Sequence, residues 1–180
     1  VTTLRQLIVD SWQTDQGLPQ NSVQTVLQTR EGYLWFGTQE GLVRFAGVTF
    51  TVFDKRTTPE MTNHNILKLY EARDGTLWIC TFGAGLLRYR DGHFTRIGPE
   101  QGLSHGIVYA ITEDHEGVFW AGTANGLNRI AGDSITVLTT REGLVENTVR
   151  ALAVGAPGEL WVGSNGGLQL LTNGRFQTRT

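Results

Sequence analysis

Histidine and cysteine, the side chains that most often bind metals or attack substrates, are few in this chain. There is one cysteine, Cys80, and there are four histidines: His64, His93, His105 and His115. A zinc site needs three or four ligands that converge on one point, and the spacing shows no such set. The sequence therefore predicts no metal site and no cofactor, and we interpret the histidines mainly as structural or solvated residues.

Motifs typical of catalysis are also missing from the sequence. The chain contains neither a nucleophile elbow nor an HExxH zinc motif. The glycine-rich residues 81–85, TFGAG, lack the lysine and the following helix that a phosphate-binding loop needs. Cys80 stands on an apolar segment where related segments carry glycine, so we expect a small packing residue rather than a reactive thiol. We therefore predict that this chain is not itself an enzyme.

The composition is that of a folded globular chain. Of the 180 residues, 39% are hydrophobic and 18% are charged, and the formal net charge is −2. Lys and Arg do not cluster, so the sequence offers no basic surface for nucleic acid or for an anionic membrane. No apolar run approaches the roughly 18 residues of a membrane-spanning helix. Because the chain begins at Val1 and ends inside an expected strand, we expect a longer parent protein, whose missing parts would supply any membrane link.

The elements that position these side chains follow from a fourfold repeat. The chain contains four versions of one segment: EGYLWFGTQEGL, DGTLWICTFGAGL, EGVFWAGTANGL and PGELWVGSNGGL. Their tryptophans are spaced by 43, 42 and 41 residues, and each follows a turn glycine; the pairs are Gly32 and Trp35, Gly75 and Trp78, Gly117 and Trp120, and Gly158 and Trp161. We call residues at the same place in successive repeats in-phase residues. A repeat of about 40 residues indicates a unit that stacks on copies of itself, and the glycines predict turns with positive φ.

Each repeat predicts four short strands. In the first repeat they cover residues 22–29, 33–38, 42–45 and 48–53, bounded by turn residues. No segment shows helical periodicity over ten residues, which excludes a helical solenoid, and the hairpin glycines disfavour a parallel β-helix. Units of about 42 residues with four antiparallel strands are typical of β-propeller blades. We therefore predict an all-β fold in which the tryptophans pack between blades rather than stack on a ligand.

The N-terminal segment is in phase with the ends of the repeats rather than with their beginnings. Residues 5–13 therefore predict a lone fourth strand that belongs to another blade. The predicted division is 1–16 for this outer closing strand and 17–60, 61–101, 102–142 and 143–180 for four successive blades.

The surplus strand bears on how the ring closes. Because the last blade already has a candidate fourth strand, the partner of residues 5–13 should lie beyond Thr180 or on another chain. We expect part of a seven- or eight-bladed ring, or a half-ring that pairs with a second copy, in preference to a closed four-bladed ring. Exposed blade faces predict self-association.

One face of a propeller gathers the polar loops. The links between blades and the turns between second and third strands lie there together, around the mouth of the central channel. The candidate ligand-binding residues on it are Gln20, Asn21, Gln39, Asn63, His64, Phe82, His105, Asn125, Glu146, Asn147 and Asn165. Such a composition suits hydrogen bonding to a polar small molecule such as an oligosaccharide. The alternative is that these side chains satisfy the backbone of their own loops.

The repeated pattern resembles the two-component regulator propeller repeat. The resemblance lies in an ordered GL, turn glycine, W-x-G-[TS] and following GL, and it covers nearly the whole chain. It implies blades of a seven-bladed ring in the extracytoplasmic sensor of a bacterial membrane-bound regulator, with a histidine kinase, hybrid kinase or diguanylate cyclase as output. The second repeat departs from the pattern, with residues 61–63 in place of the GL opening and Cys80 in place of the motif glycine.

This resemblance leads us to expect a periplasmic ligand-sensing or signal-relay domain, with any enzymatic output in a domain outside the chain. Two alternatives stay open. Propellers of similar repeat length include lyases that act on cyclic peptides with a histidine and acidic groups at the mouth. A propeller also serves in other proteins as an architectural platform for interactions, because this fold does not by itself determine function.

Overall fold

Four antiparallel sheets of four strands follow one another along the chain. The computed structural model describes residues 10–178. Strands pair in chain order within each sheet. The first sheet comprises β1 (Val23–Gln28), β2 (Leu34–Thr38), β3 (Leu42–Phe45) and β4 (Phe50–Phe53), and the second comprises β5 (Ile66–Glu71), β6 (Leu77–Thr81), β7 (Leu86–Arg90) and β8 (His93–Ile97). The third comprises β9 (Val108–Glu113), β10 (Phe119–Thr123), β11 (Gly126–Ala131) and β12 (Ser134–Leu138), and the fourth comprises β13 (Val149–Val154), β14 (Glu159–Ser164), β15 (Gly167–Thr172) and β16 (Arg175–Thr178).

These strands confirm the predicted all-β class with four strands per repeat. The predicted limits in the first repeat lie within two residues of the observed ones. Two short 3₁₀ turns, η1 (Thr14–Gln16) and η2 (Pro99–Gln101), precede the first and third sheets. Within the described residues, no helix has the length and apolar character needed to cross a membrane.

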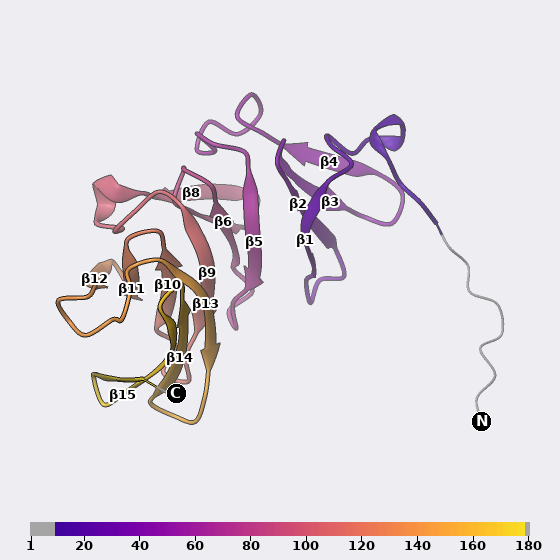
Figure 1. Ribbon diagram of the computed structural model, residues 1–180. Helices are drawn as coiled ribbons and strands as arrows, with labels where there is room; N and C mark the ends of the chain where they lie inside the picture. The colour runs from indigo at the N-terminus through magenta and orange to yellow at the C-terminus, as the bar shows by residue number, and fades with distance from the viewer. Residues whose placement is uncertain (1–9, 179–180) are drawn as a thin grey trace, which may run out of the picture.

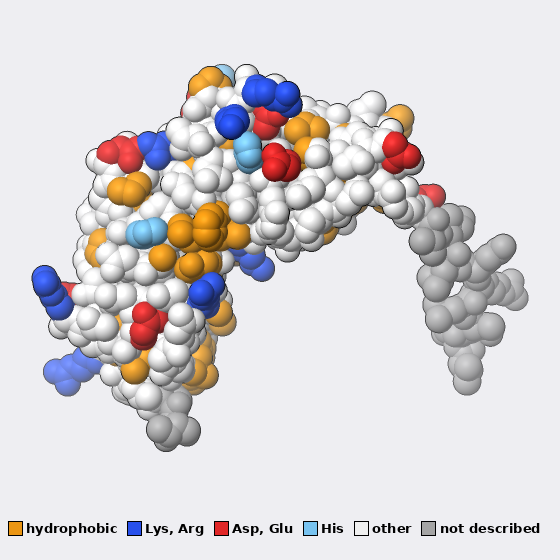
Figure 2. Space-filling view, turned by 45° about the horizontal axis from the view of Figure 1, so that its top comes forward, with side chains coloured by type: hydrophobic (Ala, Val, Ile, Leu, Met, Phe, Trp, Pro, Cys, Tyr) orange, Lys and Arg blue, Asp and Glu red, His pale blue; other side chains and the backbone are white. Residues whose placement is uncertain are grey.

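The sheets are arranged along an arc (Figure 1). The first strands of successive sheets, β1, β5, β9 and β13, contact one another, and the chain then crosses each sheet toward its fourth strand. Sheets related in this way are the blades of a β-propeller. Figure 2 shows charged side chains of both signs scattered over one face of the arc, with hydrophobic side chains gathered toward its inner edge.

Apolar side chains pack in each of the three spaces between consecutive blades. The space between blades 1 and 2 contains Trp35 and Leu42 against Ile66 and Ile79. Trp78 and Leu86 occupy the next space, and Trp120 and Leu127 the third. Burial of these in-phase residues between sheets is the inter-blade packing predicted for the tryptophans.

The motif glycines have two separate reasons to be glycine. The turn glycines before the tryptophans adopt φ between +81° and +88°, a region that residues with a Cβ rarely adopt. Gly37 and Gly122 instead allow blades to approach closely, because a Cβ there would lie 2.6 Å from Ile66 and Val149 of the following blade. Cys80 takes the same place in blade 2 and is fully buried, which raises the pKa of its thiol well above the usual value.

The predicted N-terminal strand lies mostly outside the described residues. Residues 5–9 belong to that part, and residues 10–13 are described but form no strand. Nevertheless, the Trp12 ring lies 5.2 Å from that of Phe45 and 6.3 Å from that of Phe50. Its in-phase residue Phe53 makes the same pair of contacts with the next blade, on Tyr89 and Phe94. Trp12 therefore packs as a fourth-strand residue of a preceding blade would, although the strand itself stays a prediction.

Candidate functional site

The links between blades and the turns between second and third strands meet on one face, which we call the mouth face. Backbone hydrogen bonds join these loops across blades. Gly83 and Gly85 of blade 2 donate to the carbonyl of Gly106 at 3.0 and 2.8 Å, and Gly126 of blade 3 donates to the carbonyl of Asn147 at 2.7 Å. Within blade 2, the N–H of Phe82 donates to the carbonyl of Asn65 at 2.9 Å. The grouping expected from the repeat is therefore present, and the turn after β6 and the start of β11 are each bonded to the link that opens the next blade.

Several of the candidate side chains support their own loops. In three links, the first candidate residue accepts a hydrogen bond from the backbone N–H two residues later. The bonds run from Asn65 to Asn63, from Ile107 to His105 and from Thr148 to Glu146, at 2.9, 3.0 and 2.9 Å. Asn21 and Asn147 act in a second way, since their Oδ1 atoms accept from Thr14 and Thr140 at 2.9 and 2.8 Å. In these contacts the side chains satisfy the backbone of their own links, which is the alternative to ligand binding.

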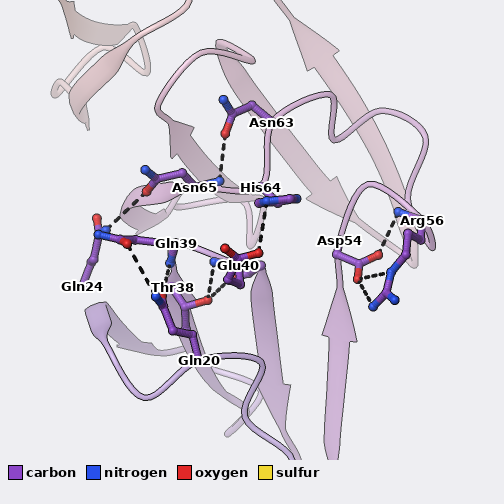
Figure 3. A network of polar contacts seen from close by, with 11 residues as sticks. Gln20, Gln24, Thr38, Gln39, Glu40, Asp54, Arg56, Asn63, His64 and Asn65 are labelled. Carbon is purple, nitrogen blue, oxygen red and sulfur yellow. Dashed lines mark hydrogen bonds and ion pairs between the residues drawn. The ribbon is translucent and has the colours of Figure 1, made fainter. Parts of the chain in front are cut away.

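The polar side chains between blades 1 and 2 form a connected network (Figure 3). Gln39 donates its backbone N–H to Oε1 of Gln20 at 3.1 Å, and the Gln20 amide returns a contact to Gln39 at 3.5 Å. Next to them, Nε2 of His64 lies 3.4 Å from Oε2 of Glu40. The network thus ties the turn after β2 to the link before β1 and the link before β5.

A recess of about 600 Å³ opens beside this network. Glu40, His64 and the loop of residues 54–57 line it. Asp54 accepts two hydrogen bonds from the Arg56 guanidinium at 2.7 and 3.0 Å and one from the Arg56 backbone at 2.8 Å. The hydrogen bonds from the Arg56 side chain lower the pKa of Asp54 to about 2. The recess therefore has a fixed, ionised edge opposite an imidazole.

Two buried polar atoms on the mouth face have no hydrogen-bond partner among the described residues: Nδ1 of His64 and Oε2 of Glu146. The His64 side chain as a whole is 23% exposed, so part of the ring is accessible. Both atoms have almost no accessible surface, so a molecule bound in the recess would meet the exposed part of the His64 ring rather than these atoms.

The remaining candidates lie on the same face but do not join the network. The Phe82 side chain is 45% exposed at the end of β6. Asn125 is exposed in the turn after β10, and its backbone N–H donates to Thr123 at 3.0 Å. Asn165 accepts a hydrogen bond from Nε of Arg150 at 3.3 Å.

Sequence reasoning missed residues of the first strands that reach between blades. Gln24 of β1 donates to Oδ1 of Asn65 at 3.3 Å. The Arg150 guanidinium of β13 lies 4.2 Å from the centre of the Tyr109 ring of β9. Gln24, Tyr109 and Arg150 are in phase, each one residue after the start of its strand. Their shared position in the repeat was the signal that the sequence offered for them. The first strand of each blade is the innermost one, so residues near its start extend the mouth face inward.

In the described part of the chain, no group of three His, Cys, Asp or Glu side chains is placed to hold a metal ion. The chemistry offered by the mouth face is hydrogen bonding by amides, two imidazoles (His64 and His105) and three carboxylates (Glu40, Asp54 and Glu146). That set of groups is suited to binding a polar molecule.

Comparisons with known proteins agree with the repeat. Three segments match the family described as two component regulator propeller: residues 17–40, 60–83 and 102–125. No curated protein matches the chain in sequence.

Solved structures share the fold. The extracellular domain of the hybrid two component system BT3049 from B. thetaiotaomicron is 26% identical, with a TM-score of 0.84 over 95% of this chain and 26% of that chain. The corresponding domain of BT4673 is 23% identical, with a TM-score of 0.74 over 89% of this chain and 23% of that one. This chain therefore spans about a quarter of each of these two domains.

An enzyme also shares the fold. A catalytically inactive virginiamycin B lyase from Staphylococcus aureus is 18% identical, with a TM-score of 0.70 over 89% of this chain and 56% of that chain. At this identity the likeness concerns the fold alone.

Proposed function

Because this chain carries repeats of the two-component regulator propeller family, we propose that it is part of an extracytoplasmic sensor propeller of a bacterial membrane-bound regulator. The observation that carries the proposal is the similarity to the extracellular domain of BT3049, at 26% identity over 95% of this chain. In this proposal the complete ring has seven or eight blades. The other blades and the output module belong to the rest of the parent protein.

The mouth face is the proposed ligand site. Gln20, Gln39 and His64 come from the two links and the turn that meet between blades 1 and 2, so one ligand there would contact both blades. Their amide and imidazole groups donate and accept hydrogen bonds, which suits a polar small molecule such as an oligosaccharide. The exposed part of the His64 ring, 23% of the side chain, supports this placement. Binding across two blades would favour one relative position of them, which is a physical route from ligand to signal.

A thermal-shift experiment with neutral disaccharides and trisaccharides tests the proposal. A ligand that binds only the folded chain at 100 times its Kd should raise the midpoint by about 5 to 10 °C. His64→Ala and Gln39→Ala should abolish the shift. His93→Ala is the matched control, because His93 is exposed at the start of β8, away from the mouth face.

The outcome separates the proposed sensor from the two alternatives. A shift that survives both mouth variants would place the ligand elsewhere, and no shift with any saccharide would favour an architectural platform. Turnover of a cyclic peptide that is lost in His64→Ala would instead favour a lyase. That alternative has only fold-level similarity behind it.

A further inference from the structure

A second recess lies between blades 3 and 4 on the face opposite the mouth. Its volume is about 370 Å³, and its lining includes the turns between β9 and β10 and between β15 and β16. One wall is Trp120, and the apolar floor consists of Leu138, Leu160 and Leu171. We call this cavity the Trp120 recess.

The other blades show why the cavity exists here. The corresponding space between blades 1 and 2 is only about 120 Å³. There, the Trp35 ring contacts two aromatic rings, Phe53 at 5.8 Å and Tyr89 at 5.1 Å between ring centres. The in-phase residues in the Trp120 recess are Leu138 and Leu171. Between blades 2 and 3, Phe119 lies 4.7 Å from Trp78, and its in-phase residue beside Trp120 is Leu160. Leucines in place of these aromatic rings leave the indole wall accessible.

The indole of Trp120 is held in a fixed orientation. Its Nε1 donates to Oδ2 of Asp114 at 2.8 Å. The other carboxylate oxygen of Asp114 accepts from the backbone N–H groups of Glu116 and Val118, at 2.9 and 3.0 Å. The Trp120 side chain is only partly buried, whereas Trp35 and Trp78 are 2% and 3% exposed. The wall is therefore preorganised and open.

Charge decides which ligand the recess suits. Three carboxylates line it, those of Asp114, Glu116 and Glu159. One guanidinium accompanies them, that of Arg129, whose Cζ lies 6.0 Å from the centre of the Trp120 ring. When His115, which also lines the recess, is counted as neutral, the lining carries more negative than positive charge around an aromatic and aliphatic interior. A positively charged amine attached to an apolar ring satisfies both features, because the carboxylates accept its hydrogen bonds and the indole covers its ring.

We propose that the Trp120 recess binds a small cationic molecule with an apolar ring against Trp120 and a protonated amine at the rim carboxylates. This site is separate from the mouth face and takes a ligand of different chemistry, so it goes beyond the proposed sensing of a polar neutral molecule. Its volume lies in the range of small-molecule pockets, about 300 to 1,000 Å³.

Fluorine NMR of the 180-residue chain labelled with 5-fluorotryptophan tests the proposal, with the Trp120 signal assigned from Trp120→Phe. The probe is 2-phenylethylamine, and the controls are 2-phenylethanol, which is neutral, and phenylacetate, which is anionic. The amine should shift the Trp120 signal while the Trp35 and Trp78 signals stay in place. Its Kd should be about tenfold lower than that of the alcohol, because the amine adds a charge-assisted hydrogen bond.

Two variants fill the recess with residues that other blades use. Leu171→Tyr copies Tyr89 and Leu138→Phe copies Phe53, so at least one should fold while removing the amine-dependent shift. Glu116→Gln and Glu159→Gln together should weaken amine binding and leave alcohol binding unchanged. Equal affinity for amine and alcohol, a shift that persists in the filled variants, or no shift at any soluble concentration of amine would overturn the proposal.

Discussion

Arg73 of blade 2 donates a hydrogen bond from Nε to Oε1 of Glu113 of blade 3, at 2.9 Å. Its backbone N–H binds the same carboxylate at 2.8 Å, and its guanidinium also reaches the carbonyls of Asp114 and His115. Arg30 makes the in-phase contacts with Glu71 and the adjoining carbonyls between blades 1 and 2. In each of the first two blade pairs, one arginine therefore connects the two blades, on the face opposite the mouth.

Replacing Arg73 should weaken the contact between blades 2 and 3. Glu113 has only 9% of its side chain exposed, whereas the Arg73 side chain is 57% exposed, so solvent screens part of the interaction. We expect Arg73→Ala to lower the free energy of unfolding by about 1 to 2 kcal/mol, measured by urea denaturation. Arg90→Ala is the control, because Arg90 pairs with Asp74 inside one blade with both side chains more than half exposed. Equal losses in the two variants would contradict an inter-blade role.

Blade spacing should depend on Gly122 but not on its in-phase residue Gly163. A Cβ at Gly122 would lie 2.6 Å from a Val149 methyl and 2.8 Å from the Val149 carbonyl oxygen. At Gly163 the nearest atom would be Cβ of Ala151, at 3.3 Å. We expect Gly122→Ala to destabilise the fold by about 1 to 3 kcal/mol through overpacking. Gly163→Ala should change stability by less than about 1 kcal/mol. Denaturant midpoints measure both, and a larger loss at Gly163 would refute the close-approach explanation.

Acid should weaken the loop that edges the mouth recess. The pKa of Asp54 is lowered from 3.8 to about 2, chiefly by hydrogen bonds from the Arg56 side chain. A carboxyl with a depressed folded-state pKa contributes stability above its unfolded pKa, and loses it as pH falls through the folded value. The difference in unfolding free energy between the wild type and Asp54→Asn should thus be constant above about pH 5 and shrink between pH 4 and pH 2. Urea denaturation at several pH values measures it, and a difference independent of pH would contradict the ion pair.

Much of this fold follows from the sequence because its information is periodic. Trp35 and its in-phase tryptophans locate β2, β6, β10 and β14, and the turn glycines locate the hairpins before them. The mouth face followed from topology, since loops at one end of every blade must lie together. The position of a residue within its repeat determines where its side chain lies, and the repeat can be recognised from the sequence alone.

What the sequence did not reveal depends on contacts between unlike residues in different blades. The turn-shaping bonds of Asn63 and His105 depend on the geometry of each link, so the sequence offered these residues as ligand-binding candidates without showing that their side chains also hold the links. The Trp120 recess depends on the combined volume of three side chains that are distant in sequence. A signal for it was present, because Leu138 and Leu171 replace the aromatic residues Phe53 and Tyr89, but only the packing shows that these positions share one space.

The outer face of blade 4 should mediate self-association of this chain. Leu42, Leu86 and Leu127 are each 0% exposed against the following blade, whereas their in-phase residue Leu168 is 47% exposed. Among residues 10–178 no sheet follows blade 4, and at the other end of the array Val26 is 58% exposed where a preceding blade would pack. Apolar faces that fit copies of themselves associate in water.

Leu168→Lys should therefore reduce concentration-dependent association, measured by analytical ultracentrifugation, with little loss of stability. Val48→Lys is the control, because Val48 is 88% exposed in the turn between β3 and β4, away from the blade face.

Alanine variants test the same difference in burial. Leu127→Ala should lower the free energy of unfolding by about 2 to 5 kcal/mol and Leu168→Ala by less than about 1 kcal/mol, since only the first leaves a cavity. A wild-type chain that stays monomeric at high concentration would show that the exposed leucine does not drive association, and equal costs for the two alanine variants would mean that Leu168 is covered in solution.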